Sequence, residues 1–467
     1  MASLFDRYQK EKRLKKQVGK KPAPTPSASA KSTGNALVIE RLSHEGRGVA
    51  RDAQGKTVFV AGALPGERVT AQITHSRNRY NEAEVSTIQL SSEHRVVAPC
   101  EHYQECGGCN LQHLQYSEQV SCKHTMIAEH FQREHVVLPA SAEPAILSQE
   151  YGYRRKARLG VTSTKSQGLV LGFRQRNSNK LTPIQHCLVL EPGLQPLLPA
   201  LQALVPTLRG KGNIGHIELL ADAAGSHAVI RFTNEVTSED KEKWQLWGEQ
   251  NNVILWAENN HGDVAPMFID SVNLSYQIGA INFRFLPTDF LQVNAQVNQA
   301  MVAQASEWLG LRGNERVLDL FSGFGNFTLP LAQQCSTIIG VEGLASQVAQ
   351  AKLNASDNAI QNASFYQADL TKPLTSFAWA KEPFDVVVLD PPRAGAELIC
   401  SAIGELSPKY ILYISCNPAT LARDAALLTR FGYHIERYAV LDMFPQTAHA
   451  ETMMLFKHPV ELTLGRS

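Results

Sequence analysis

Residues 317–327 of the chain read VLDLFSGFGNF, which combines an apolar run, a glycine turn and the start of a helix. Glycines in such a turn let the backbone approach a ligand closely, and the first turn of the helix offers free N–H groups. The glycine spacing is not that of a dinucleotide-binding GxGxxG motif, and no lysine follows that would make a phosphate loop. The stretch therefore predicts a buried strand that leads into a ligand-binding turn.

Strands and helices alternate around this stretch, in the pattern of a doubly wound parallel sheet. The predicted strands span residues 316–320, 336–341, 363–367, 384–389 and 410–415, and helical stretches include 342–358 and 418–430. We therefore expect an α/β, Rossmann-like domain over residues 291–467.

Three acidic residues follow successive strands of this predicted sheet. Glu342 ends the strand after the glycine turn, Asp369 follows the next strand, and Asp390 opens an Asp-Pro-Pro-Arg sequence after the fourth. Because ligands bind at the carboxyl ends of strands in open α/β sheets, the three carboxylates point to one crevice. Glu342 can accept both hydroxyls of a ribose and Asp369 can reach an adenine amine. A nucleoside cofactor without a pyrophosphate fits better than NAD, and S-adenosylmethionine is the obvious candidate.

Cys416 ends the fifth predicted strand, on the rim of the same crevice, and a helix begins directly after it. A helix N-terminus lowers the pKa of a thiol. A thiolate is not needed to methylate an amine, but it is needed when the acceptor is C5 of a pyrimidine, because addition at C6 makes C5 nucleophilic. A base must then remove the C5 proton, and Glu451, at the start of an apolar strand, is the candidate. His449 lies nearby, and we expect it to be structural.

The first 95 residues differ in character from the rest of the chain. Residues 1–35 predict a disordered basic arm, since the first 36 residues hold nine Lys/Arg against two Asp/Glu, whereas the whole chain has a net charge of +1. Residues 36–95 predict a small β-barrel with strands at 36–42, 56–60, 69–74 and 82–88.

A loop of this predicted barrel combines cationic and aromatic side chains. Residues 75–81 include Arg77, Arg79 and Tyr80, which suit phosphate and stacking contacts with single-stranded RNA. The barrel is therefore a candidate RNA-binding module.

The chain has eight cysteines, no secretory signal and no apolar run long enough to span a membrane. We therefore expect the thiols to be free, metal-bound or catalytic rather than paired in disulfides. Cys335 and Cys400 lie in apolar surroundings and are expected to be structural.

Cys100, Cys106 and Cys109 lie within ten residues, and two glycines between the last two allow a tight wrap around a metal. Three thiolates in this arrangement suit zinc or an iron–sulfur cluster. The fourth ligand is open, since Cys122, Cys187 and, less readily, His113 could each supply it.

Taken together, the motifs resemble those of the RNA uracil-C5 methyltransferases over about residues 36–460. They are C-x5-CGGC at 100–109, FLQVN at 290–294, DLFSGFGN at 319–326, DPPR at 390–393, SCNP at 415–418 and FPQTAHAE at 444–451. The segments EGRGVA at 45–50 and GALPGE at 62–67 are similar to a TRAM domain, an OB-like RNA-binding barrel. Ser322 and Phe324 depart from residues that are often Cys and Met in the family.

The resemblance implies a role for each candidate residue. Cys416 would be the nucleophile and Glu451 the base. The S-adenosylmethionine site would be lined by Gln292, Phe321, Asn326, Glu342, Asp369 and Asp390. A 4Fe-4S cluster would be held by Cys100, Cys106, Cys109 and Cys187.

The resemblance also implies the order of domains and the substrate. A TRAM barrel at 36–95 would precede an α+β central domain at 96–290, which carries the cluster, and the methyltransferase domain at 291–467. Within the family, the resemblance is strongest to members that methylate a specific uridine in bacterial 23S ribosomal RNA. The uridine would flip out of the RNA to reach Cys416. Arg154, Arg155 and Lys156 are further candidates for RNA contacts.

Three alternatives remain open on the sequence. The first is a uracil-C5 methyltransferase for another ribosomal RNA site or a tRNA loop. The second is an amine methyltransferase that uses the Asp-Pro-Pro sequence. The third is an RNA-binding iron–sulfur protein without catalytic activity. In each case we expect a cytoplasmic protein with no membrane partner and no obligate protein partner.

Overall fold

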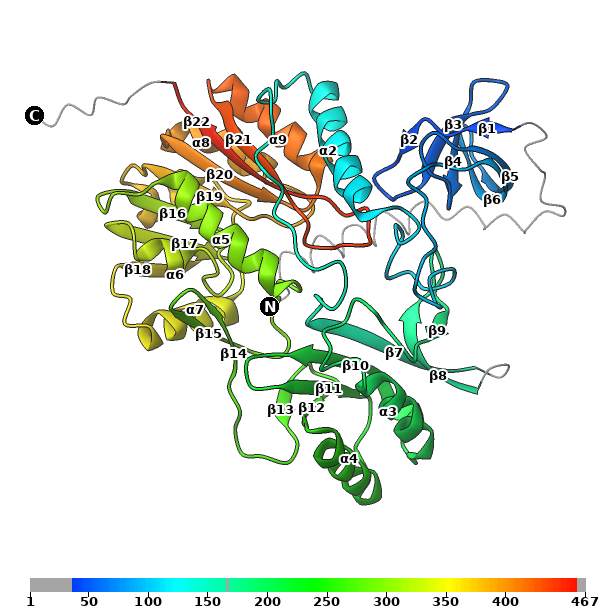
Figure 1. Cartoon of the computed structure of the whole chain (residues 1–467). Helices are drawn as coiled ribbons and strands as arrows, with labels where there is room; N and C mark the ends of the chain where they lie inside the picture. The colour runs from blue at the N-terminus through cyan, green and yellow to red at the C-terminus, as the bar shows by residue number, and fades with distance from the viewer. Residues whose placement is uncertain (1–35, 165–167, 460–467) are drawn as a thin grey trace, which may run out of the picture.

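The computed structural model describes residues 36–164 and 168–459, which contain three large β-sheets and one small one (Figure 1). The predicted basic arm at 1–35 lies outside the described residues. Among the described residues, no helix combines the length and the apolar character needed to cross a membrane.

The first sheet, blue in Figure 1, has six strands in the order β1-β5-β6-β4-β3-β2. Its strands are β1 (Leu37–Val38), β2 (Arg41–Leu42), β3 (Gly48–Arg51), β4 (Thr57–Ala61), β5 (Arg68–Ser76) and β6 (Tyr80–Leu90). The single strand predicted at 36–42 is thus two short strands that pair with different neighbours, and β3 was missed. Alternate side chains of β4 are buried, as in a sheet with one covered face.

The central sheet has seven strands in the order β13-β12-β11-β10-β7-β8-β9. They are β7 (Lys156–Thr164), β8 (Gly168–Arg174), β9 (Leu181–Pro183), β10 (Ile214–Ala221), β11 (Ser226–Phe232), β12 (Val253–Glu258) and β13 (Val264–Pro266). Helices α3 (Leu197–Leu204) and α4 (Ser238–Asn251) pack in the same apolar core. The prolines around α3 keep it short, and a 3₁₀ turn at Val205–Thr207 follows it.

The C-terminal sheet has seven strands in the order β18-β17-β16-β19-β20-β22-β21. They are β16 (Arg316–Leu320), β17 (Thr337–Glu342), β18 (Ala363–Gln367), β19 (Val386–Leu389), β20 (Tyr410–Ser415), β21 (His434–Leu441) and β22 (Glu451–Lys457). The first five in space are parallel, and β22 runs antiparallel to both of its neighbours. The predicted α/β, Rossmann-like domain is confirmed.

Helices cover both faces of this sheet, which explains why its central strands are apolar without alternation. Val386 and Val388 join one core, while Val387 and Leu389 join the other. The first core includes side chains of α5 (Ala295–Leu309), α6 (Thr328–Ala332) and α7 (Ala345–Asp357). The second includes those of α8 (Glu397–Leu406) and α9 (Pro418–Arg430).

Two elements that precede residue 291 also belong to these C-terminal cores. Helix α2 (Tyr116–Arg133), cyan in Figure 1, lies against α9 and buries Ile127 and Phe131 in the second core. The hairpin of β14 (Leu274–Ile278) and β15 (Ile281–Phe285) packs in the first core. The predicted domain boundaries at 96 and 290 stay a prediction, and these elements pack across them.

Candidate functional site

The glycine turn after β16 carries three residues with positive φ. Phe321, Gly323 and Gly325 have φ of 66°, 55° and 99°. The N–H groups of Phe321 and Ser322 both donate to the carbonyl of Val341, at 2.9 and 3.1 Å. The turn is therefore held against the end of β17, and a non-glycine residue in the left-handed region at Phe321 marks a locally strained backbone.

The carboxylates predicted to line the crevice lie at the ends of neighbouring strands. Glu342 accepts hydrogen bonds from the backbone N–H groups of Gly323 (3.2 Å) and Leu344 (3.0 Å), which ties the glycine turn to α7. Asp369 accepts from the backbone and hydroxyl of Thr371. Burial raises the pKa of Asp390 to about 7.

Asp319 is a buried carboxyl group of this site that the sequence interpretation did not single out. It accepts a hydrogen bond from the Thr328 hydroxyl at 2.5 Å, whereas its other oxygen is buried with no partner among the described residues. Burial, with smaller contributions from Asp390 and Glu342, raises its pKa to about 7. It lies inside an apolar strand, so the pattern indicated a core position.

The structure uses the Asn326 side chain within the protein. Its Oδ1 accepts from the Tyr276 hydroxyl (2.8 Å) and from the Asn298 amide (3.0 Å), and its own amide donates back to Asn298 at 3.0 Å. Asn326 thereby links the glycine turn to α5. The backbone carbonyl of Gln292, just before α5, accepts from the Arg155 guanidinium at 2.8 Å. The predicted cofactor contacts of Gln292 and Asn326 stay predictions.

Strand register brings Cys416 and Glu451 together. Ser415 pairs with Thr452 in the antiparallel ladder of β20 and β22, so Cys416 and Glu451 are the next residues in register. Glu451 also pairs with Leu441 of β21 and is only 8% exposed. Two residues far apart in sequence, a thiol and a carboxyl group, thus share the end of adjacent strands.

Electrostatics at this pair favour the neutral forms of both groups. Burial raises the pKa of Cys416 to about 11, with Glu451 and Asp390 adding to the shift and Arg393 opposing it. Burial raises the pKa of Glu451 to about 8, and Asp390 adds to this while Lys123 and Arg393 oppose it. The net pKa of the thiol is therefore raised and not lowered, because burial and two carboxyl groups act against the lowering predicted from the helix N-terminus.

The loop of residues 100–109, here called the cysteine loop, packs closely against the end of β8 in the central sheet. The Arg176 guanidinium donates to the carbonyls of Tyr103 and Cys109 at 2.7 Å and of Cys106 at 3.2 Å. At Gly107, a Cβ atom would lie 2.9 Å from the carbonyl oxygen of Arg174. The glycine is therefore required for the close approach of this loop to β8.

The pKa values of two cysteines respond to neighbouring thiols. Burial is the main cause that raises the pKa of Cys109, and Cys106 and Cys100 add to the rise. Burial likewise raises the pKa of Cys187, and Cys109 and Cys106 add to it. Cys122 lies elsewhere, in an apolar cluster with Leu42, Leu114 and Met126. No group of three or more His, Cys, Asp or Glu side chains within residues 36–164 and 168–459 is arranged to hold a single metal ion.

The remaining predicted residues separate into exposed and internal groups. Arg77 and Arg79 are exposed near the tip of the β5–β6 hairpin, and Tyr80 packs edge-on against Phe59 at 5.4 Å. Arg155 is only 4% exposed, and its guanidinium lies 4.7 Å above the Tyr276 ring. The prediction that Arg155 contacts RNA is therefore wrong.

Lys156 is likewise engaged within the protein. Its ammonium forms an ion pair with Glu218 at 2.8 Å and donates to the carbonyl of Pro287 at 2.7 Å. Cys335 and Cys400 are buried in the C-terminal cores, as expected, whereas His449 is exposed.

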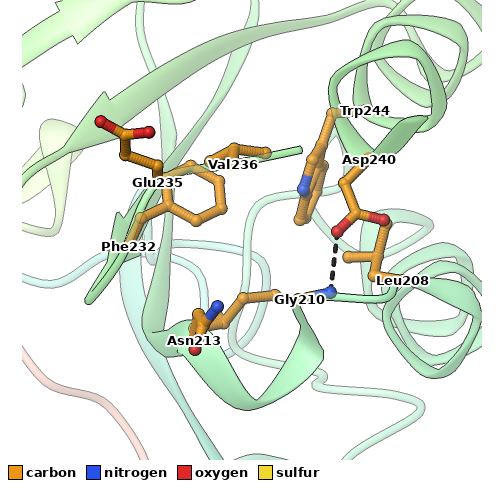
Figure 2. A pocket seen from close by; sticks show the side chains of 9 residues that line it. Leu208, Gly210, Asn213, Phe232, Glu235, Val236, Asp240 and Trp244 are labelled. Atoms are coloured by element: carbon orange, nitrogen blue, oxygen red, sulfur yellow. Dashed lines mark hydrogen bonds between the residues drawn. The ribbon is translucent and has the colours of Figure 1, made fainter. Parts of the chain in front are cut away.

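A small hollow beside the central sheet lies apart from these residues. Figure 2 shows it beside Trp244, where Asp240 accepts a hydrogen bond from the backbone N–H of Gly210 at 2.8 Å. None of the predicted site residues lines it. The Asp240 carboxylate already holds the loop before β10, so the strand ends of the C-terminal sheet are the better candidate site.

The fold is that of an S-adenosylmethionine-dependent methyltransferase. The sequence profile described as tRNA (Uracil-5-)-methyltransferase matches residues 267–459, and the TRAM domain profile matches residues 37–86. The chain belongs to the family of RNA uracil-C5 methyltransferases that carry a TRAM domain.

Two relatives and one solved structure illustrate this membership. The chain is 42% identical to the 23S rRNA (uracil(1939)-C(5))-methyltransferase RlmD of Pseudomonas putida, over 90% of this chain and 93% of that protein. It is 41% identical to RlmD of Psychromonas ingrahamii, over 93% and 98% of the two chains. The crystal structure of Pyrococcus abyssi tRNA (uracil-54, C5)-methyltransferase is similar in fold, with a TM-score of 0.71, 22% identity and coverage of 90% and 99%.

Proposed function

We propose that this protein transfers a methyl group from S-adenosylmethionine to C5 of uracil-1939 in 23S ribosomal RNA. The observation that carries the proposal is the register of β20 and β22, in which Ser415 pairs with Thr452, so that Cys416 and Glu451 follow at the same end of the two strands. Identity above 40% to RlmD proteins over 90% of the chain supports this substrate in particular.

The crevice suits a nucleoside cofactor on its own residues. Gly323 has φ of 55° and would place a Cβ in nearly open space, so the turn leaves room for a ligand. The carboxylates of Glu342 and Asp369 at the neighbouring strand ends can accept hydroxyl and amine protons. We propose that Gln292, Phe321, Asn326 and Asp390 complete this site. When bound, S-adenosylmethionine supplies an electrophilic methyl group on its sulfonium.

In the proposed reaction, Cys416 activates the uracil ring and Glu451 removes the C5 proton. The Cys416 thiolate adds to C6 of the uracil, and the electron pair of the C5=C6 bond moves to C5, which takes the methyl group. The ionised form of Glu451, made a stronger base by a pKa raised to about 8, removes the proton from C5, and the C–H electron pair re-forms the double bond while the C6–S bond breaks. The products are 5-methyluridine and S-adenosylhomocysteine, and the thiolate is restored. Burial raises the pKa of Cys416, and the charge of Arg393 opposes that rise and so favours the thiolate at the start.

We further propose that Cys100, Cys106, Cys109 and Cys187 hold a 4Fe-4S cluster. Neighbouring cysteines of this set add to the burial that raises the pKa values of Cys109 and Cys187, whereas the charged neighbour that raises the pKa of Cys122 is Glu118. This difference supports the set over one that includes Cys122. Each thiolate of such a cluster binds a separate iron, so the four sulfur atoms need not converge on one point as around a single ion. The cluster would brace the loop that Arg176 holds, between the proposed TRAM barrel at 36–95 and the proposed central domain at 96–290.

The decisive experiment uses 23S ribosomal RNA from cells that lack this protein, with labelled S-adenosylmethionine. We expect label in 5-methyluridine at position 1939, and none with Cys416→Ala. Replacement of the target by 5-fluorouridine should trap a covalent complex at residue 416, because C5 then carries no proton to remove. Label on an exocyclic amine, at another uridine or in tRNA, or a crosslink at another residue, would overturn the proposal.

A further inference from the structure

The loop that carries Glu451 is held by side chains from a distant part of the chain. This loop, residues 444–450, is the last part of the connection from β21, which ends at Leu441, to β22, and it ends directly before Glu451. Gln119 of α2 exchanges two hydrogen bonds with Gln446, at 2.9 and 3.0 Å. The Tyr153 hydroxyl donates to the carbonyl of Pro445 at 3.0 Å. The position of the loop therefore depends on residues outside the C-terminal sheet.

Asn110, the residue after Cys109, also bonds this loop, and its side chain reaches the part of the loop nearest Glu451. Its backbone N–H donates to the carbonyl of Gln446 at 3.1 Å, and its Oδ1 accepts from the backbone N–H of Ala448 at 2.8 Å. Its Nδ2 donates to the carbonyl of Glu45 at 2.8 Å, in a turn of the first sheet. One side chain thus joins the cysteine loop, the loop before Glu451 and the first sheet.

The residues around Asn110 and Ala448 are closely packed. Ala448 and Ala450 are buried in an apolar cluster with Leu42 and Leu64 of the barrel segment. Gly46 has φ of 73°, and a Cβ there would lie 3.1 Å from the Cβ of Ala448. Because Ala450 is joined directly to Glu451, a shift of the loop at Ala448 displaces the Glu451 carboxyl group relative to Cys416.

We propose that Asn110 is a positioning residue for the removal of the C5 proton, acting through the loop and Glu451. The inference rests on the proposed function, in which Glu451 takes the proton, the C–H electron pair re-forms C5=C6 and the Cys416 thiolate leaves. Asn110 has no part in thiolate addition or methyl transfer, since its contacts run to the loop of Glu451 and not to Cys416.

The test compares two rates in the full-length protein and in Asn110→Ala. With RNA that carries 5-fluorouridine at the target, the rate of covalent complex formation reports addition and methyl transfer, because no proton removal is possible afterwards. With ordinary RNA, the release of 5-methyluridine also includes proton removal. We expect the first rate to change by less than about twofold and the second to fall by about tenfold or more, as for a misplaced general base. A covalent complex with ordinary RNA should accumulate.

Asn362→Ala is the matched control. Asn362 also donates two side-chain hydrogen bonds to backbone carbonyls, at 2.8 Å to Ala332 and 3.0 Å to Cys335, but it contacts no part of the loop. It should leave the ratio of the two rates unchanged. The ratio does not depend on the active concentration, so partial unfolding cannot imitate the effect. Gly46→Ala, which pushes on Ala448 from the barrel side, should shift the ratio in the same direction if Asn110→Ala does not fold.

The outcomes separate this inference from the proposed function. If the unaltered protein forms neither 5-methyluridine nor the trapped complex, the proposed function fails. If it forms both, and Asn110→Ala lowers the two rates equally or neither of them, the positioning role of Asn110 is wrong while the proposed function stands.

Discussion

The ammonium group of Lys123 lies 2.5 Å from Oδ1 of Asp442, and neither side chain has any exposed surface. The other carboxylate oxygen of Asp442 accepts from the Tyr116 hydroxyl at 2.7 Å. Lys123 also donates to the carbonyl of Phe444 at 3.3 Å. The pair joins α2 to the end of β21, one residue beyond the position where Leu441 pairs with Glu451. A buried charge pair thus fixes the end of β21, the strand whose Leu441 pairs with the proposed base Glu451 on β22.

Removal of the lysine charge should destabilise the fold strongly. Lys123→Met keeps most of the side-chain volume but leaves Asp442 buried without its cation, which costs about 3–5 kcal/mol for a pair of this kind. Unfolding by urea, followed by circular dichroism, measures the loss. Lys457→Met is the matched control, since it breaks a partly exposed pair with Glu436 at 3.1 Å, and such pairs contribute below about 1 kcal/mol. Equal losses in the two variants would contradict the interpretation.

Much of the C-terminal domain could be predicted from local sequence. The strands Arg316–Leu320, Ala363–Gln367 and Tyr410–Ser415 and the helix Pro418–Arg430 have the predicted bounds. The helix is fixed by proline in its first turn and by the Asn417 side chain, which accepts from the N–H of Ala419. These signals act over a few residues, so the sequence reveals them directly.

The rest depends on contacts between segments that are far apart in the chain. Nothing near Lys123 in sequence indicates that its ammonium is buried, because its partner Asp442 is more than 300 residues away. Arg155 appeared to be a surface cation, since burial of a guanidinium over the Tyr276 ring cannot be seen in local composition. Glu451 and Cys416 could be named as candidates, but their adjacency follows from the register of β20 and β22.

The stability of the protein should fall as pH rises through the range in which Glu451 titrates. Its pKa is raised from 4.5 to about 8 by burial, so between these values the folded state binds more protons than the unfolded state. Glutamine at this position does not ionise. Glu451→Gln should therefore match the unaltered protein near pH 4.5 and melt about 2 °C or more above it near pH 8.

Scanning calorimetry at both pH values tests this expectation. Glu93→Gln, which alters a carboxylate whose side chain is 88% exposed, should not change the melting temperature at either pH. If Glu451→Gln were stabilised relative to the unaltered protein at pH 4.5 and not at pH 8, the pKa shift of Glu451 would have the opposite sign. That result would contradict burial as its cause.

The fourth ligand of the proposed iron–sulfur cluster can be identified by comparing two serine variants. Besides burial, Cys109 and Cys106 raise the pKa of Cys187, whereas Glu118 is the charged neighbour that raises the pKa of Cys122. Anaerobically prepared Cys187→Ser should lose most of its iron and its visible absorption, while Cys122→Ser should retain both. Iron and sulfide analysis measures the outcome. Loss of iron in Cys122→Ser alone would transfer the ligand role to Cys122, and zinc in place of iron would exclude the cluster.

Arginines of the barrel and of the central domain should affect RNA binding in different ways. Arg77 and Arg79 are exposed and free to contact phosphates, so replacing either with alanine should reduce the slope of log affinity against log salt by about 0.7. Arg155→Ala should leave that slope unchanged and lower the melting temperature, because its buried guanidinium holds the Gln292 carbonyl and covers Tyr276. Filter binding over a salt series separates the two effects. A slope that falls in Arg155→Ala and stays constant in Arg77→Ala would mean that RNA lies along the central sheet and not on the barrel hairpin.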